Sequence, residues 1–140
     1  MRPKRLALVL LCLPLALLAQ PAGAAEVKYF DVPQGDHPHD VAPAPDGTVW
    51  YTGQHKGVLG SLDPKTGKVE RIPLGDGSSP HGVIVGPDGA AWVTDSGLNA
   101  IVRVDPATRA VKTWKLPKDR ANVNLNTCLL YTSPSPRDRS

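Results

Sequence analysis

The sequence predicts an all-β fold, an incomplete β-propeller, from a repeat, a strand pattern and a set of turn signals. Within the 140-residue chain, Pro38-His39 recurs 42 residues later as Pro80-His81. Four short strands separated by turns, in a repeat of about 40–45 residues, are typical of a propeller blade. We therefore expect two four-stranded blades, at about residues 34–75 and 76–117.

Each repeat contains its own turn signals. Pro87 and Gly89 belong to a Gly-Pro-Asp-Gly turn, in which proline presets φ and glycine accepts a positive φ. Apolar and polar residues alternate in the stretches around it, as in strands that bury one face. In the second repeat, the expected strands cover 81–85, 90–94, 100–104 and 110–116.

Two tryptophans, Trp50 and Trp92, occupy equivalent positions in the two repeats. A blade cannot bury both of its faces alone, so neighbouring blades share the core that lies between them. We expect the two indoles to fill such spaces. Stacking on a ligand is the alternative.

A further match lies before the first blade, where Val27–Pro33 resembles Val111–Pro117 at twice the repeat period. We expect Val27–Val32 to be an outer strand that would complete the last blade of a closed ring. Residues 118–127 would begin a third blade and stop short. Two full blades are fewer than the roughly four to eight of a closed propeller, so we expect little stability from this chain alone.

The two ends of the chain do not belong to the repeat. Residues 1–25 combine a basic start, an apolar run and Ala22-Gly23-Ala24, which predicts a signal peptide and a periplasmic or secreted protein. Cleavage is expected after Ala24 or Ala25. Residues 128–140 break the pattern, and Cys128–Asp138 matches the translation of a sequencing adaptor. We interpret this tail as non-native; a Pro/Ser-rich linker is the alternative.

The charge and the cysteine content limit the kinds of binding partner that we expect. Of the net charge of +3, residues 1–25 contribute +3 and residues 128–140 contribute +1, which leaves −1 for residues 26–127. This part has no basic patch that would indicate binding to nucleic acid or to an anionic membrane. It also has no cysteine and hence no disulfide or zinc–thiolate site. We expect no nucleic-acid partner, no membrane association after signal cleavage, and a monomer when the propeller is complete.

Propeller geometry selects the candidate site. The first strand of each blade lines the central channel, and the second strand returns to the rim where the first began. His39 and His81 start first strands, whereas Gln54, His55 and Asp95 follow second strands. We expect these five residues to bind a small-molecule ligand on the channel rim.

Less specific interpretations of the same residues stay open. The imidazoles of the two Pro-His turns could serve only to form a hydrogen bond with a backbone carbonyl group. Asp95 could cap a turn, and His55 could be a solvated loop residue. His37 and His39 would point to opposite sides of an extended strand, which makes them poor joint metal ligands. The residues indicate no catalytic group and no metal ligand in this chain.

The blade resembles those of a known family. Pro-His-Gly-Val at Pro80, the Gly-Pro-Asp-Gly turn, Ala-Trp-Val-Thr-Asp at Ala91 and a last strand ending in Leu-Pro are similar to the repeats of streptogramin B lyases. These are virginiamycin B lyase-like propellers of about seven blades. The resemblance covers Val27 to Pro117.

The resemblance implies a carbon–oxygen lyase that opens a cyclic depsipeptide at its ester by elimination, with magnesium as cofactor. A histidine would act as the general base, and magnesium would stabilise the developing negative charge. In the family, the catalytic histidines lie in Pro-His-Gly positions of the last blades, so His39 and His81 match the position within a blade but not the catalytic blades. By this resemblance, the 140-residue chain alone would be inactive and would hold no cofactor.

Two other functions remain open. The complete protein could be a non-catalytic secreted propeller that binds a small ligand or a protein, or a lactonase-like hydrolase. A histidine and glutamate pair on the last blades would favour the lyase.

Overall fold

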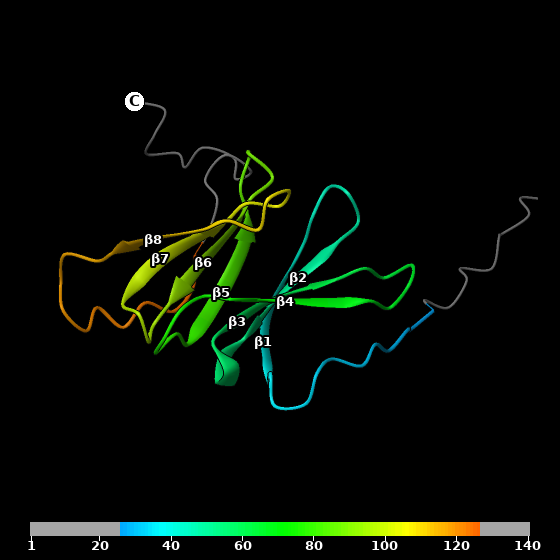
Figure 1. Cartoon of the computed structure of the whole chain (residues 1–140), viewed down its shortest axis with the longest axis horizontal. Helices are drawn as coiled ribbons and strands as arrows, with labels where there is room; N and C mark the ends of the chain where they lie inside the picture. The colour runs from blue at the N-terminus through cyan, green and yellow to red at the C-terminus, as the bar shows by residue number, and fades with distance from the viewer. Residues whose placement is uncertain (1–25, 127–140) are drawn as a thin grey trace, which may run out of the picture.

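Two four-stranded antiparallel sheets make up the fold of this computed structural model, as the sequence predicts (Figure 1). The structure describes residues 26–126, so the predicted signal peptide and the adaptor-like tail lie outside the described residues. The first sheet contains β1 (Pro38–Pro43), β2 (Val49–Gly53), β3 (Val58–Leu62) and β4 (Val69–Pro73). The second contains β5 (Pro80–Val85), β6 (Ala91–Asp95), β7 (Ala100–Val104) and β8 (Val111–Lys115).

Each sheet is a meander in which every strand pairs with the next strand along the chain. The turn before β2 contains Gly47 with φ of 90°, and the turn before β6 contains Gly89 with φ of 74°. Positive φ at these sites favours glycine, which explains why both repeats carry Asp-Gly there. Figure 1 shows the two sheets side by side, with β1 and β5 in contact.

The pairing irregularities repeat as well. The register between β1 and β2 shifts between Pro38 and Val41, and that between β5 and β6 shifts between Pro80 and Gly82. Such bulges bend a strand and redirect its side chains. Both shifts occur where a histidine follows a proline, so the two histidines start from similar backbone geometry.

The core lies between the two sheets. Trp50 is 1 % exposed and packs in one apolar cluster with residues of both sheets, including Leu59, Val93 and Val102. Alternation along β6 places Trp92 on the other side of its sheet from Val93. Trp92 is half-buried there and stacks on Trp114, with ring centroids 5.6 Å apart. Of the two expected indoles, the structure therefore buries Trp50 between the blades.

Three segments differ from the simple expectation. Residues 26–33 form no strand, although Val27–Val32 was expected as an outer strand. A strand needs a partner for its backbone groups, and the described residues supply none for this segment. Lys28 instead donates to the carbonyl oxygen of Pro64 at 3.1 Å. In addition, Gln54–Lys56 forms one turn of 3-10 helix that the sequence did not predict.

The start of the expected third blade also forms no strand, but it bonds to the second sheet at β6. Thr94 Oγ1 donates to the carbonyl oxygen of Asn124 at 2.5 Å, and Asn126 Nδ2 donates to the carbonyl oxygen of Trp92 at 2.9 Å. Asn124 and Asn126 thus lie against β6. Across residues 26–126, no helix has the length and apolarity needed to cross a membrane.

Candidate functional site

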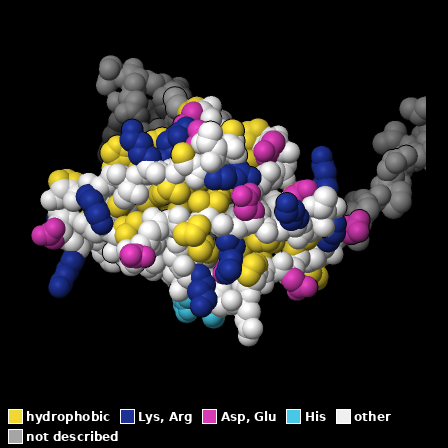
Figure 2. Space-filling model, viewed as in Figure 1, with side chains coloured by type: hydrophobic (Ala, Val, Ile, Leu, Met, Phe, Trp, Pro, Cys, Tyr) yellow, Lys and Arg dark blue, Asp and Glu magenta, His cyan; other side chains and the backbone are white. Residues whose placement is uncertain are grey.

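All four histidines of the chain are paired with one another. The rings of His39 on β1 and His81 on β5 have centroids 3.8 Å apart and are tilted by 50°. The rings of His37 and His55 are stacked, with centroids 4.0 Å apart. Figure 2 shows imidazoles gathered at one edge of the molecule. The structure therefore brings together His39 and His81, two of the predicted site residues.

Two hydrogen bonds between the sheets hold this arrangement. Asp40 Oδ2 accepts from the backbone N–H of Val83 at 3.0 Å. Thr52 Oγ1 donates to the carbonyl oxygen of His81 at 2.9 Å. Asp40 follows His39, and the other bond ends on His81 itself. The inner strands of the two blades are thus joined at the residues that carry the imidazole pair.

The second pair depends on an unusual backbone. His37 has φ of 49°, in the left-handed region that non-glycine residues seldom adopt. This conformation precedes β1 and directs His37 to His55 on the 3-10 turn, whereas His39 contacts His81. His55 is exposed and Gln54 beside it is half-buried. His37 and His39 therefore have separate ring partners.

Asp95 is buried, and residues of two loops donate hydrogen bonds to it. It is 0 % exposed and accepts hydrogen bonds from Ser78 Oγ at 2.5 Å, Ser79 N at 2.9 Å and Leu98 N at 2.9 Å. These contacts match the alternative in which Asp95 caps a turn. Asp95 is not part of the contact between the rings of His39 and His81. The imidazole Nδ1 of His81 is buried without a hydrogen-bond partner among the described residues.

A buried polar cluster in the first blade was missed by the sequence reasoning. Asp36 is 0 % exposed, accepts from Tyr51 Oη at 2.7 Å and pairs with Arg71 Nη1 at 3.1 Å. Burial, and then the hydrogen bond to Asp36, raises the pKa of Tyr51 above its usual range. The signal was a departure from the repeat, because the second blade has Val93 and Thr113 at the equivalent positions.

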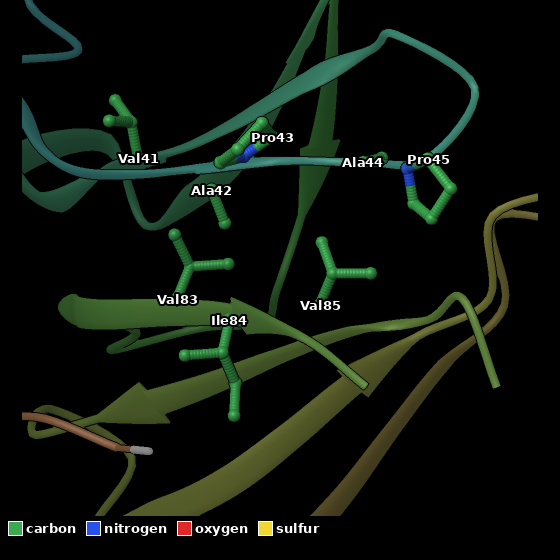
Figure 3. Close-up of a pocket in the computed structure, with 8 residues that line it drawn as sticks. All are labelled: Val41, Ala42, Pro43, Ala44, Pro45, Val83, Ile84 and Val85. Carbon is green, nitrogen blue, oxygen red and sulfur yellow. The ribbon is translucent and has the colours of Figure 1, made fainter. Parts of the chain in front are cut away.

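An apolar wall lies farther along the two strands that carry His39 and His81 (Figure 3). A groove of about 620 Å³ is lined only by alanine, valine, isoleucine and proline from β1, β5 and the turn after β1. Val41 within it is 60 % exposed. The lining residues are Val41, Ala42, Pro43, Ala44, Pro45, Val83, Ile84 and Val85. The inner strands therefore offer polar imidazoles at their start and apolar side chains beyond.

The described residues do not fit a magnesium site. Within 26–126, no group of three or more histidine, cysteine, aspartate or glutamate residues is placed to hold a metal ion. Magnesium prefers oxygen ligands, whereas the side chains that the structure pairs here are imidazoles. The carboxylates nearest to them, Asp36, Asp40 and Asp95, already accept hydrogen bonds from the protein.

Comparison with known proteins identifies the class of fold first. No family model matches the chain. A virginiamycin B lyase from Streptomyces coelicolor is 40 % identical over 51 residues, which are 36 % of this chain and 17 % of that protein. The fold matches the structure of a catalytically inactive virginiamycin B lyase variant from Staphylococcus aureus with quinupristin. That match has a TM-score of 0.68 at 20 % identity and covers 74 % of this chain and 35 % of the lyase.

A second solved streptogramin B lyase gives a TM-score of 0.61 at 26 % identity and covers 66 % of this chain and 31 % of its own. The two sheets thus match part of a lyase propeller. The fold is virginiamycin B lyase-like, and the sequence match is distant and partial. The chain spans about a third of the length of these solved lyases.

The same blades occur in proteins with other names. A Kuenenia stuttgartiensis hydrazine synthase structure matches with a TM-score of 0.54 at 22 % identity, covering 66 % of this chain and 27 % of that one. Function belongs to a site more than to a fold. A functional assignment must therefore be based on the imidazole pairs and the apolar wall.

Proposed function

We propose that this chain supplies two neighbouring blades of an exported, streptogramin lyase-like propeller whose rim binds a small cyclic peptide ester. The observation that carries the proposal is the contact between His39 and His81, 3.8 Å between ring centroids, at the start of adjacent inner strands. The partial match to virginiamycin B lyase supports the choice of ligand class.

The chemistry of the rim suits such a ligand. Small-molecule sites combine apolar surface with a few polar groups that fix orientation. Here the imidazoles can donate or accept hydrogen bonds, and the groove farther along β1 and β5 offers apolar contact. An ester-linked ring with aromatic and aliphatic side chains has the matching combination of carbonyl groups and apolar surface.

In this proposal, the described residues bind and orient the ligand. The general base, and the magnesium ion that the resemblance implies, would belong to the last blades of the complete propeller. His39 and His81 would hold the ligand against the channel wall. The predicted signal peptide supports a location of the complete protein in the periplasm or outside the cell.

Calorimetric titration of the complete propeller with quinupristin tests this proposal. We expect His39→Ala and His81→Ala each to weaken binding by about tenfold, which corresponds to roughly 1.4 kcal/mol. Lys65→Ala is the matched control, because Lys65 lies exposed in the hairpin between β3 and β4 and should leave the affinity unchanged. Wild-type affinity in both folded histidine variants would remove the imidazole pair from the site.

A second candidate is a propeller that binds its ligand without chemistry. The observation that favours it is the engagement of Asp36, Asp40 and Asp95 in hydrogen bonds within the protein. These carboxylates serve the structure of the blades, which favours a rim that binds without catalysing. Under this candidate the histidine variants would weaken binding, and the ligand would be recovered unchanged.

A further inference from the structure

Buried carboxylates hold the loops that enter both inner strands. The loop before β1 contains Asp36, which bonds Tyr51 and Arg71 of its own blade. The loop before β5 is held by Asp95 at the end of β6. Asp95 accepts from both Ser78 and Ser79 of that loop, which immediately precede Pro80 and His81.

The two carboxylates stand at different positions of the repeat. At an offset of 42 residues, Asp36 corresponds to Ser78, and Gly53 corresponds to Asp95. The first blade therefore carries its carboxylate on the loop, and the second blade carries it on the end of the second strand.

These positions face each other in both blades. A Cβ added at Gly53 would lie 3.4 Å from the Cβ of Asp36. In the second blade, Ser78 Oγ and Asp95 Oδ2 are 2.5 Å apart. The carboxylate therefore stands on the loop in the first blade and on the facing strand end in the second. In both blades its hydrogen bonds hold the loop to the sheet.

A third position differs between the blades in a way that makes room for the carboxylate on the strand end. A Cβ at Gly53 would lie 2.5 Å from Cγ2 of Val58, which is too close for a side chain to fit without movement. The residue equivalent to Val58 in the second blade is Ala100, which lacks the γ-carbon atoms. The three positions read Asp, Gly and Val in one blade and Ser, Asp and Ala in the other.

We propose that Asp36 and Asp95 are positioning residues that set the contact between His39 and His81. Each fixes the loop that leads to its histidine, so that the two inner strands bring their imidazoles into contact. This inference deepens the proposed function and rests on it only for what the rim binds. The contact between the two imidazoles can be measured without a ligand.

The measurement is cross-relaxation between the ring protons of His39 and His81, by nuclear magnetic resonance on the full chain with labelled histidine. We expect a cross-peak in the wild type and its loss in Asp36→Ala and in Asp95→Ala. Asp95→Asn should keep it, because the amide oxygen can still accept from Ser79 N and Leu98 N. Val102→Ala is the control: it opens a cavity in the core away from both loops, so it should lower the melting temperature and keep the cross-peak.

A graft tests the exchange itself. Asp36→Ser alone should lose the cross-peak, whereas Asp36→Ser combined with Gly53→Asp and Val58→Ala copies the second blade and should restore it. Wild-type cross-peaks in Asp36→Ala and Asp95→Ala would overturn the proposal. So would loss of the cross-peak in Val102→Ala, because the contact would then follow overall stability. If the single variants do not fold, a folded graft that lacks the cross-peak overturns it. A variant that keeps the cross-peak and still fails to bind quinupristin would count against the proposed function and leave the positioning role intact.

Discussion

Thr52 Oγ1 donates a hydrogen bond of 2.9 Å to the carbonyl oxygen of His81, and so joins the second strand of one blade to the first strand of the next. The equivalent residue of the second blade, Thr94, donates to the carbonyl oxygen of Asn124 at 2.5 Å. The hydroxyl at this position of the repeat therefore reaches the following inner segment twice. In the first blade, this hydrogen bond therefore fixes the backbone of His81 on the rim relative to the preceding blade.

Replacing Thr52 with valine tests this link. Thr52 is 0 % exposed, so the change leaves the carbonyl oxygen of His81 without this donor in a buried place. We expect the free energy of unfolding to fall by about 1–2 kcal/mol. Urea denaturation measures it, with Thr113→Val on exposed β8 as the control that should change little. Equal stability of Thr52→Val and wild type would show that the bond does not hold the blades together.

The core between the sheets gives a larger expected effect. Leu59 is 0 % exposed and belongs to the cluster that contains Trp50 and residues of the second sheet. Leu59→Ala should lower the free energy of unfolding by about 2–5 kcal/mol, because it removes buried methyl groups and leaves a cavity between the blades. Leu125→Ala, at a side chain that is 70 % exposed, is the matched control. If denaturant melts of Leu59→Ala and Leu125→Ala coincide, the two sheets do not share a core.

Acid should weaken the hairpins opposite the histidine rim. Bonds from Thr108, first from its backbone N–H and then from its hydroxyl, hold the pKa of Asp105 below its ordinary value of 3.8. The hydroxyl of Thr66 and the backbone N–H of Lys65 lower the pKa of Asp63 in the same way. A carboxylate whose pKa falls on folding adds stability above its unfolded pKa and loses it as the pH drops through the folded value.

We therefore expect the double variant Asp63→Asn with Asp105→Asn to be less stable than wild type at pH 7. The difference should shrink as the pH falls below about 4. Chemical denaturation across this range measures both proteins. A stability difference that stays constant from pH 7 through the acid range would mean that the two carboxylates do not act through their charge.

The repeat predicted most of the fold because its information is local. Strand alternation and Asp-Gly turns occur in each period, and the expected strand at 100–104 is β7 as observed. The same period predicted that His39 and His81 would take equivalent places, and the structure puts their rings in contact. Residues 26–33 form no strand, because a strand also depends on a partner that the local sequence does not provide.

The rest of the candidate site depends on features that do not repeat. The left-handed φ of His37, which directs its ring to His55, has no counterpart in the second blade. The burial of Asp36 depends on Tyr51 and Arg71, which occur in one blade alone. Asp95 lies on the expected rim segment, but its burial follows from three donors in two loops that the repeat does not specify.

Mass spectrometry of quinupristin after incubation with the complete propeller tests the proposed lyase function most directly. Elimination breaks the bond between the ester oxygen and its alkyl carbon and removes a proton from the neighbouring carbon, so that a carbon–carbon double bond and a carboxylic acid form. The linear product therefore has the same mass as the cyclic substrate. Hydrolysis of the same ester instead adds one water molecule and gives a carboxylic acid and an alcohol. We expect a linear product of unchanged mass, with a fragmentation pattern that differs from that of the ring. A product heavier by one water would identify a hydrolase, and recovery of the intact ring at saturating protein would contradict any catalytic role.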